Sequence, residues 1–128
     1  MTEPPLIAVW QQVTHRLLAA LDDALADLGL SAGEINALAC IGDQTSVRDL
    51  VAATAQRPST LTGVLDRLER RGLIERAANP ADRRSVLVRL TPDGRGRAAR
   101  IAVAFTALEE RLPGAEVRRL LAALDEAV

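Results

Sequence analysis

The chain has 128 residues, enough for one domain with a buried core, and its 48% hydrophobic and 26% charged residues are typical of a globular protein. No apolar run approaches the roughly 20 residues that span a bilayer. The N-terminus also lacks the basic and apolar regions of a secretory signal, so we expect a cytoplasmic protein with no membrane partner.

The net charge of −1 conceals an uneven distribution along the chain. Residues 1–56 carry a net charge of −5, residues 57–100 carry +6, and residues 101–128 carry −2. All 16 basic residues are arginine. A basic middle segment between acidic ends is what a local face for binding a polyanion produces. A solvated helical face with mixed charges would give the same counts.

The N-terminal third of the sequence predicts two helices. No helix breaker lies between Pro5 and Gly29, and apolar residues recur there at three- and four-residue steps, which predicts one long amphipathic helix. Ser31 followed by Glu34 is a capping box and predicts a second helix that ends near Gly42. The expected inward positions are Leu6, Trp10, Val13, Leu17, Leu21, Leu25 and Leu28 in the first helix, and Ile35, Leu38, Ala39 and Ile41 in the second.

Two further helices follow closely. Ser46 with an acidic residue three positions later predicts a short helix over 46–54. Pro58 suits the first turn of the next helix, expected over 58–71, because the N–H that proline lacks has no helical partner there. Gly72 is well placed as the residue after that helix. Its apolar stripe consists of Leu61, Val64, Leu65 and Leu68.

The hydrophobic period then changes. Segments 73–77 and 85–90 are short and rich in branched residues, and the turn-type cluster 78–82 separates them, which predicts an antiparallel hairpin. Thr91-Pro92 opens another helix, whose apolar positions include Phe105, and Pro113-Gly114 precedes a last one. We therefore expect a single domain, mainly α with a small β-hairpin.

Residues 46–90 together have the pattern of a helix-turn-helix followed by a basic hairpin, which is a DNA-binding arrangement. In a helix-turn-helix, the second helix enters the major groove and the first braces it, and a thin basic loop fits the minor groove. The hairpin is positioned to be that loop. The first and last helices are too apolar for isolated surface helices, so we expect association through them; completion of a monomeric core is the alternative.

Four motifs make the resemblance specific. They are Leu30-Ser-x-x-Glu34, Thr62-x-x-x-Asp-Arg-Leu-Glu-x-x-Gly72-Leu-Ile, Asp82-Arg-Arg-Ser85 and Leu90-Thr-Pro-Asp-Gly94. In this order and spacing they closely resemble the MarR family of bacterial transcription regulators. The resemblance implies a winged helix-turn-helix core over 31–95, dimerisation helices over 5–29 and 96–128, and a homodimeric regulator, more often a repressor, on a palindromic operator of double-stranded DNA.

The resemblance also implies roles in the wing. The family's Asp-x-Arg motif is matched by Asp82 and Arg84, with Arg83 between them. Arg84 is expected to enter the minor groove, because guanidinium is planar, weakly hydrated and always charged. Asp82 is expected to hold the Arg84 side chain by a charge-assisted hydrogen bond. Pairing of the two residues across a turn, with no DNA contact, is the structural alternative.

On the recognition helix, the apolar stripe leaves an outward face. Its small hydroxyl residues suit phosphate and base-edge contacts, and Arg67 suits a guanine or a phosphate, unless it pairs with acidic neighbours on its own helix. Arg57 stands where a small polar cap is common in the family, and we expect it to contact a phosphate instead. Arg70 and Arg71 are expected to solvate the helix end and favour its dipole. The expected DNA-binding set is Arg57, Ser59, Thr60, Thr62, Gly63 and Arg67.

Other functions find little support. The family typically responds to small molecules, metals or oxidants, but no residue here identifies such an effector. Cys40 is expected to be a buried structural thiol, and one cysteine with one histidine, His15, cannot build a typical zinc site. No nucleophile–base pair stands at a recognisable spacing, so we expect no enzyme, cofactor or metal. A winged-helix module that binds protein and not DNA is the second hypothesis.

Overall fold

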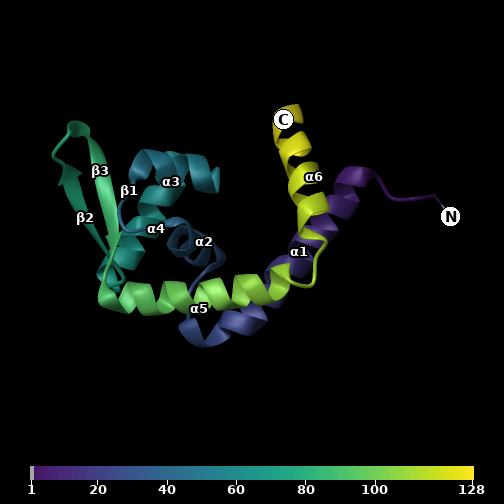
Figure 1. The fold of residues 1–128 in the computed structure, drawn as a ribbon, viewed down its shortest axis with the longest axis horizontal. Helices are drawn as coiled ribbons and strands as arrows, with labels where there is room; N and C mark the ends of the chain where they lie inside the picture. Colours follow the sequence, from purple (N-terminus) through teal and green to yellow (C-terminus); the bar gives the residue numbers. More distant parts are fainter. Residues whose placement is uncertain (1) are drawn as a thin grey trace.

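The computed structural model describes residues 2–128 and shows a mainly helical protein with one small antiparallel sheet (Figure 1). The expected fold class is confirmed, with a third, two-residue strand that we did not predict. The elements are α1 (Leu6–Leu25), the 3₁₀ turn η1 (Ala26–Leu28), α2 (Ala32–Cys40), β1 (Thr45–Ser46), α3 (Val47–Thr54), α4 (Pro58–Arg70), β2 (Ile74–Asn79), β3 (Asp82–Leu90), α5 (Pro92–Glu109) and α6 (Gly114–Ala127).

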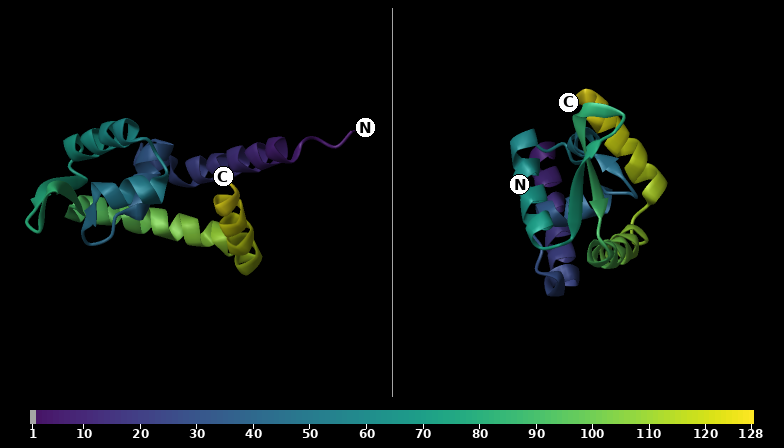
Figure 2. Two further views of the ribbon diagram at one scale, coloured as in Figure 1. Left: turned by 90° about the horizontal axis from the view of Figure 1, so that it is seen from above. Right: turned by 90° about the vertical axis from the view of Figure 1, so that its left-hand side faces the viewer.

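The elements form an elongated molecule with two unlike ends (Figures 1 and 2). Helices α2, α3 and α4 gather at one end beside the β2–β3 hairpin, which projects from them. Helix α5 runs from the base of the hairpin to the other end, where it meets α6 and crosses α1. One end is therefore a winged helix-turn-helix, and the other is an arrangement of long helices.

The core lies under the winged end and follows the predicted periodicity. All four residues of the α4 stripe are buried. They pack in one cluster with residues such as Leu38, Leu50 and Ile101. In α2, the inward assignment of Ala39 was wrong, because Ala39 is exposed and Ala37 is fully buried instead. Helix α2 packs against α4 and α5 and buries Ala37 in the core cluster, which the three- and four-residue spacing of the larger side chains did not indicate.

The sheet has the order β1-β3-β2, with all neighbours antiparallel. The hairpin is longer than predicted, because its strands continue to Asn79 and Asp82 and leave only a two-residue turn. Side chains close this turn: Asn79 Oδ1 accepts a hydrogen bond from Ala81 N at 2.9 Å. Asp82, Arg83 and Arg84 therefore lie on strand β3, and Asp82 is not part of a loop.

Helices α1 and α6 leave their apolar stripes uncovered. In α1, only Leu25 is buried, and Trp10, which we expected on a core stripe, is 42% exposed. No residue of α6 is buried, and Leu120 and Leu121 are 66% and 46% exposed. Phe105 of α5 is half-buried. The alternative in which these helices complete a monomeric core therefore does not describe this chain.

A buried glycine joins the hairpin to α5. Thr91 caps α5, because its Oγ1 accepts a hydrogen bond from Gly94 N. The same hydroxyl donates to Gly72 O at 2.6 Å, and the Thr91 N–H donates to Leu73 O at 3.1 Å. A Cβ on Gly94 would overlap the Leu73 carbonyl. Only glycine allows the start of α5 to approach the base of the hairpin this closely.

We predict that Gly94→Ala destabilises the protein by about 1–3 kcal/mol, because the backbone of Leu73 must move to admit the methyl group. Gly96→Ala is the matched control: it lies in the same helix with open space around it and should stabilise by about 0.5–1 kcal/mol. Urea unfolding at one fixed protein concentration measures both. Equal effects of the two substitutions would contradict the close contact.

Candidate nucleic-acid interface

Helices α3 and α4 form the helix-turn-helix. Ser46 caps α3 by accepting a hydrogen bond from Asp49 N at 3.0 Å, as predicted. Ala55 ends α3 in the left-handed conformation, with φ of 53°. Glycine adopts this conformation without strain, so the alanine is tolerated at a cost in free energy.

The N-terminus of α4 is open to solvent. Arg57 is its N-cap residue and makes no side-chain capping hydrogen bond, so the first amides of the helix stay free to bind an anion. Ser59 and Thr60 are exposed. Thr62 is also exposed, but its hydroxyl donates to Pro58 O at 2.9 Å, which leaves its oxygen to act as an acceptor.

Further along α4, the side chain of Arg67 lies beside Gly63. Gly63 is half-buried, and a Cβ at this position would lie 3.6 Å from Arg67 Nη1. The guanidinium of Arg67 therefore lies back along the helix. Within residues 2–128 it forms no ion pair with Asp66, whose carboxylate instead contacts Arg76 of β2. The alternative of a pair within the helix does not hold for Arg67.

The three predicted wing residues are exposed together at the start of β3. The expected contact between Asp82 and the Arg84 guanidinium is not the one observed. Asp82 Oδ1 accepts instead from the main-chain N–H of Arg84 at 3.0 Å, because an aspartate reaches the amide two residues ahead with little loss of entropy. Asp82 thus shapes the start of the strand and leaves the Arg84 side chain without an ion pair among the described residues.

The recognition helix and the wing meet at one hollow of about 280 Å³. Thr62 of α4 and Arg84 of the wing both line it, so the structure brings these two predicted residues together. Arg48 of α3 also lines the hollow and is exposed. We did not single out Arg48, because it lies in the acidic part of the sequence and reaches this surface only through the fold.

Arg76 fastens the wing to the recognition helix, and sequence reasoning missed it. Its Nη2 lies 2.7 Å from Asp66 Oδ1 and 3.1 Å from Glu69 Oε1, and its main-chain N–H donates to Glu69 Oε2. The hydrogen bond from Arg76 lowers the pKa of the Glu69 carboxyl, and the same contact raises the pKa of Arg76. These contacts hold β2 against the outer face of α4.

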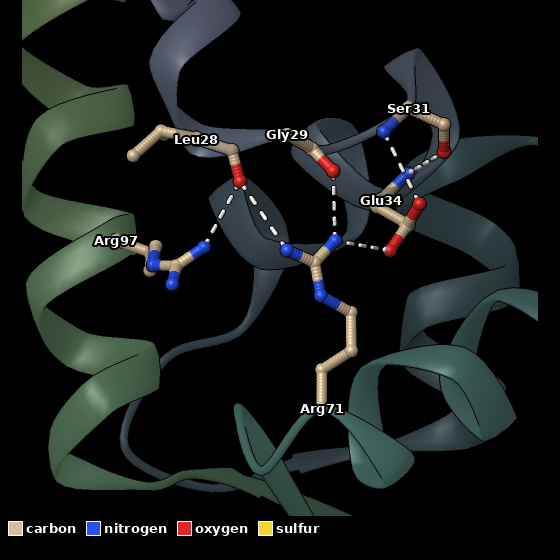
Figure 3. A network of polar contacts seen from close by, with 6 residues as sticks. All are labelled: Leu28, Gly29, Ser31, Glu34, Arg71 and Arg97. Atoms are coloured by element: carbon tan, nitrogen blue, oxygen red, sulfur yellow. Dashed lines mark hydrogen bonds and ion pairs between the residues drawn. The ribbon is translucent and has the colours of Figure 1, made fainter.

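Arg71 does not solvate the helix end as expected. Its guanidinium donates to Gly29 O at 2.8 Å and to Leu28 O at 3.3 Å, and lies 3.7 Å from Glu34 Oε2 (Figure 3). No sequence signal indicated these contacts, because even the two hydrogen bonds join residues 42 and 43 positions apart. The end of α4 is therefore attached to the corner between α1 and α2.

Cys40 and His15 belong to no metal-binding cluster within residues 2–128. Cys40 is half-buried, and burial raises the pKa of its thiol, which keeps it protonated and unreactive near neutral pH. His15 is exposed. Within residues 2–128, no three histidine, cysteine, aspartate or glutamate side chains are grouped to hold a metal, and no helix is long and apolar enough to cross a membrane.

Comparisons with known proteins agree with this geometry. A model of the MarR family matches residues 30–86. The multiple antibiotic resistance protein MarR of Salmonella typhimurium is 38% identical over 93 residues, which are 70% of this chain and 64% of that protein, so the match spans less than two thirds of the relative.

Two solved structures are similar over nearly the whole chain. Bordetella bronchiseptica BpsR, described with regulation of its DNA binding by 6-hydroxynicotinic acid, has a TM-score of 0.80 and 28% identity over 99% of this chain and 95% of that one. A mutant MarR from E. coli in complex with operator DNA has a TM-score of 0.76 and 26% identity over 97% and 94% of the two chains.

We predict that acid weakens the attachment of the wing through Glu69. Because the pKa of this carboxyl is lower in the folded chain than its ordinary value of 4.5, its contribution to stability is fully present above pH 4.5. The contribution is lost as the pH falls through the lowered pKa. Glu69→Gln should therefore lose less stability than the wild type on acidification to about pH 3, as measured by urea unfolding. Glu75→Gln, on strand β2 next to Arg76, is the control, and identical pH profiles for Glu69→Gln and the wild type would refute the prediction.

Proposed function

This chain belongs to the MarR family, whose members are transcription regulators and not enzymes, and we propose that it represses transcription in the cytoplasm as a homodimer bound to a palindromic operator. The observation that carries the proposal is the shared surface of Thr62, Arg84 and Arg48, in which the helix-turn-helix and the wing present hydroxyl and guanidinium groups side by side. The similar E. coli protein was solved with operator DNA.

Each part of this surface suits a different part of the duplex. The N-terminus of α4 would enter the major groove, where Ser59, Thr60 and Thr62 meet base edges or phosphates. Arg67, whose guanidinium lies beside Gly63, would reach a guanine or a phosphate. Arg57, which is exposed and makes no capping hydrogen bond, would neutralise a phosphate beside the first turn of α4.

The wing would enter the adjacent minor groove. Arg84 supplies the guanidinium that favours a narrow groove of negative potential, and Arg83 beside it adds charge for the phosphates. Asp82 acts through the backbone, since its bond to the Arg84 amide fixes the direction in which β3 leaves the turn. Arg76 then keeps the whole hairpin at a constant distance from α4.

The other end of the molecule supports the dimer. Contact of the exposed apolar residues of α1 and α6 with water is unfavourable, so a partner surface would cover them. In a symmetric regulator this partner is a second copy of the chain. We assign residues 31–95 to the DNA-binding core and 5–29 and 96–128 to dimerisation. Two recognition helices would then lie about 34 Å apart, one turn of DNA. A small-molecule effector is part of the proposal, since BpsR responds to one.

A titration with DNA tests the function directly. The full chain is mixed with a fragment from its own upstream region and with an unrelated fragment at two salt concentrations. Tight, salt-dependent binding that favours the upstream fragment is the expected result. Absent or salt-insensitive binding would favour the winged-helix module that binds protein.

We predict that Arg84→Ala weakens binding to the upstream fragment by about 1–3 kcal/mol, because the minor-groove guanidinium is lost. Arg119→Ala, on the exposed side of α6, makes the same change in charge far from the wing and should have little effect. Unchanged affinity in Arg84→Ala would remove the wing from the mechanism.

We predict that Leu121→Asp shifts the protein from dimer to monomer in sedimentation equilibrium, with a loss on the order of 2 kcal/mol of association free energy. The substitution places a charge on the exposed apolar face of α6. Arg119→Asp, on the opposite side of the same helix, should leave the dimer intact. A wild type that is monomeric at micromolar concentration would overturn the dimer.

A further inference from the structure

The corner between α1 and α2 leaves backbone carbonyl groups without helical partners. Helix α1 ends in the 3₁₀ turn η1, and Gly29 follows in the left-handed conformation with φ of 62°. The last carbonyls of a helix have no N–H to accept from, and burying them unpaired costs free energy. Here the carbonyls of Leu28 and Gly29 accept from arginine side chains instead.

Two other helices supply those arginines. Arg71, the C-cap residue of α4, donates to both carbonyls, and Arg97 of α5 donates to Leu28 O at 3.0 Å (Figure 3). The Leu28 carbonyl is therefore shared by guanidinium groups from α4 and α5. Three helices that are distant in sequence converge on one peptide group.

A buried carboxylate makes Arg71 difficult to replace. The side chain of Glu34 is 8% exposed, and its Oε1 accepts from Ser31 N at 3.1 Å to complete the capping box of α2. Its Oε2 is buried and accepts no hydrogen bond among the described residues, and Arg71 Nη1 is the cation 3.7 Å away. A buried carboxylate whose cationic partner is removed is strongly unfavourable.

We propose that Arg71 is a positioning residue for DNA recognition, which fixes the tilt of α4 relative to α1 and α5 without touching DNA. The inference rests on the proposed function. Helix α4 has 13 residues and is about 20 Å long, so a tilt of about 6° at its anchored end moves its reading end by about 2 Å. A shift of that size breaks hydrogen bonds to base edges.

Positioning and direct contact predict different binding results. A phosphate contact contributes to every DNA sequence, and its loss lowers the salt slope by about one. A positioning residue affects only the contacts that depend on the tilt of the helix. The ratio of affinities for the upstream and the unrelated fragment, together with the salt slope, therefore separates the two roles and also excludes a general loss of folded protein.

The experiment compares Arg71→Ala, Arg71→Lys and Arg70→Ala in the full chain. Arg70 is the exposed neighbour and loses the same charge. We expect Arg71→Ala to lower the ratio of affinities for the upstream and the unrelated fragment at least about tenfold. Its affinity for the unrelated fragment and its salt slope should match those of Arg70→Ala. Arg71→Lys keeps the charge but not the planar fork, so it should restore the ratio only in part. If Arg71→Ala lowers both affinities equally, or leaves the ratio unchanged, the proposal is overturned.

A second measurement does not depend on DNA. In Arg71→Ala, hydrogen exchange should accelerate at two main-chain amides. They are the amide of Ser31, which donates to Glu34, and the amide of Leu73, which follows α4 and donates to Leu68 O. Exchange at both amides should stay unchanged in Arg70→Ala. If the wild type binds neither DNA fragment, the proposed function fails, and this measurement alone decides whether Arg71 couples the helices. Unchanged exchange at both amides would overturn the coupling. If Arg71→Ala does not fold, Glu34→Gln, which keeps the cap and removes the charge, tests the same coupling.

Discussion

The shared carbonyl of Leu28 is the contact on which the arrangement of helices depends. Covalent connection alone does not fix the angles between α1, α4 and α5, since each joins its neighbours through a turn. Arg71 and Arg97 meet at that carbonyl, and Arg100 of α5 adds a two-point contact to Asp27 of the same turn, at 2.8 and 2.9 Å. A guanidinium has five donors in a rigid plane, so one side chain can bind several oxygens at once. This explains a use for arginine in a chain that has no lysine.

The arginines of the basic segment divide into two groups. Between residues 57 and 100 there are eleven, and four of them bind within the chain: Arg71, Arg76, Arg97 and Arg100. The other seven form no ion pair within residues 2–128. Because Arg71 and Arg100 pair with Glu34 and Asp27 from outside the segment, its net charge of +6 overstates the charge free to meet a polyanion. Three of the seven remaining arginines lie where α4 begins and in the wing: Arg57, Arg83 and Arg84.

Local features were predictable from the sequence and contacts across the fold were not. The capping box of Ser31 and the buried stripe of α4 depend on residues three or four positions apart, so spacing alone was enough. The length of the hairpin depended on Asn79 and Asp82 bonding to the backbone, which composition did not distinguish from a loop. Arg71 and Arg76 were missed because their partners lie on other elements. Trp10 was misplaced because an apolar stripe does not say whether its partner is the same chain.

The proposed pairing through α1 and α6 has a consequence for how operator occupancy depends on the amount of protein. If a protomer must pair before it can hold both halves of an operator, the binding species grows with the square of protein concentration whenever monomers predominate. Occupancy of the operator would then fall steeply as the cell dilutes the protein through growth, and recover steeply on synthesis. Under the proposed dimer, a threshold of this kind needs no effector, because pairing through the apolar stripes of α1 and α6 creates it.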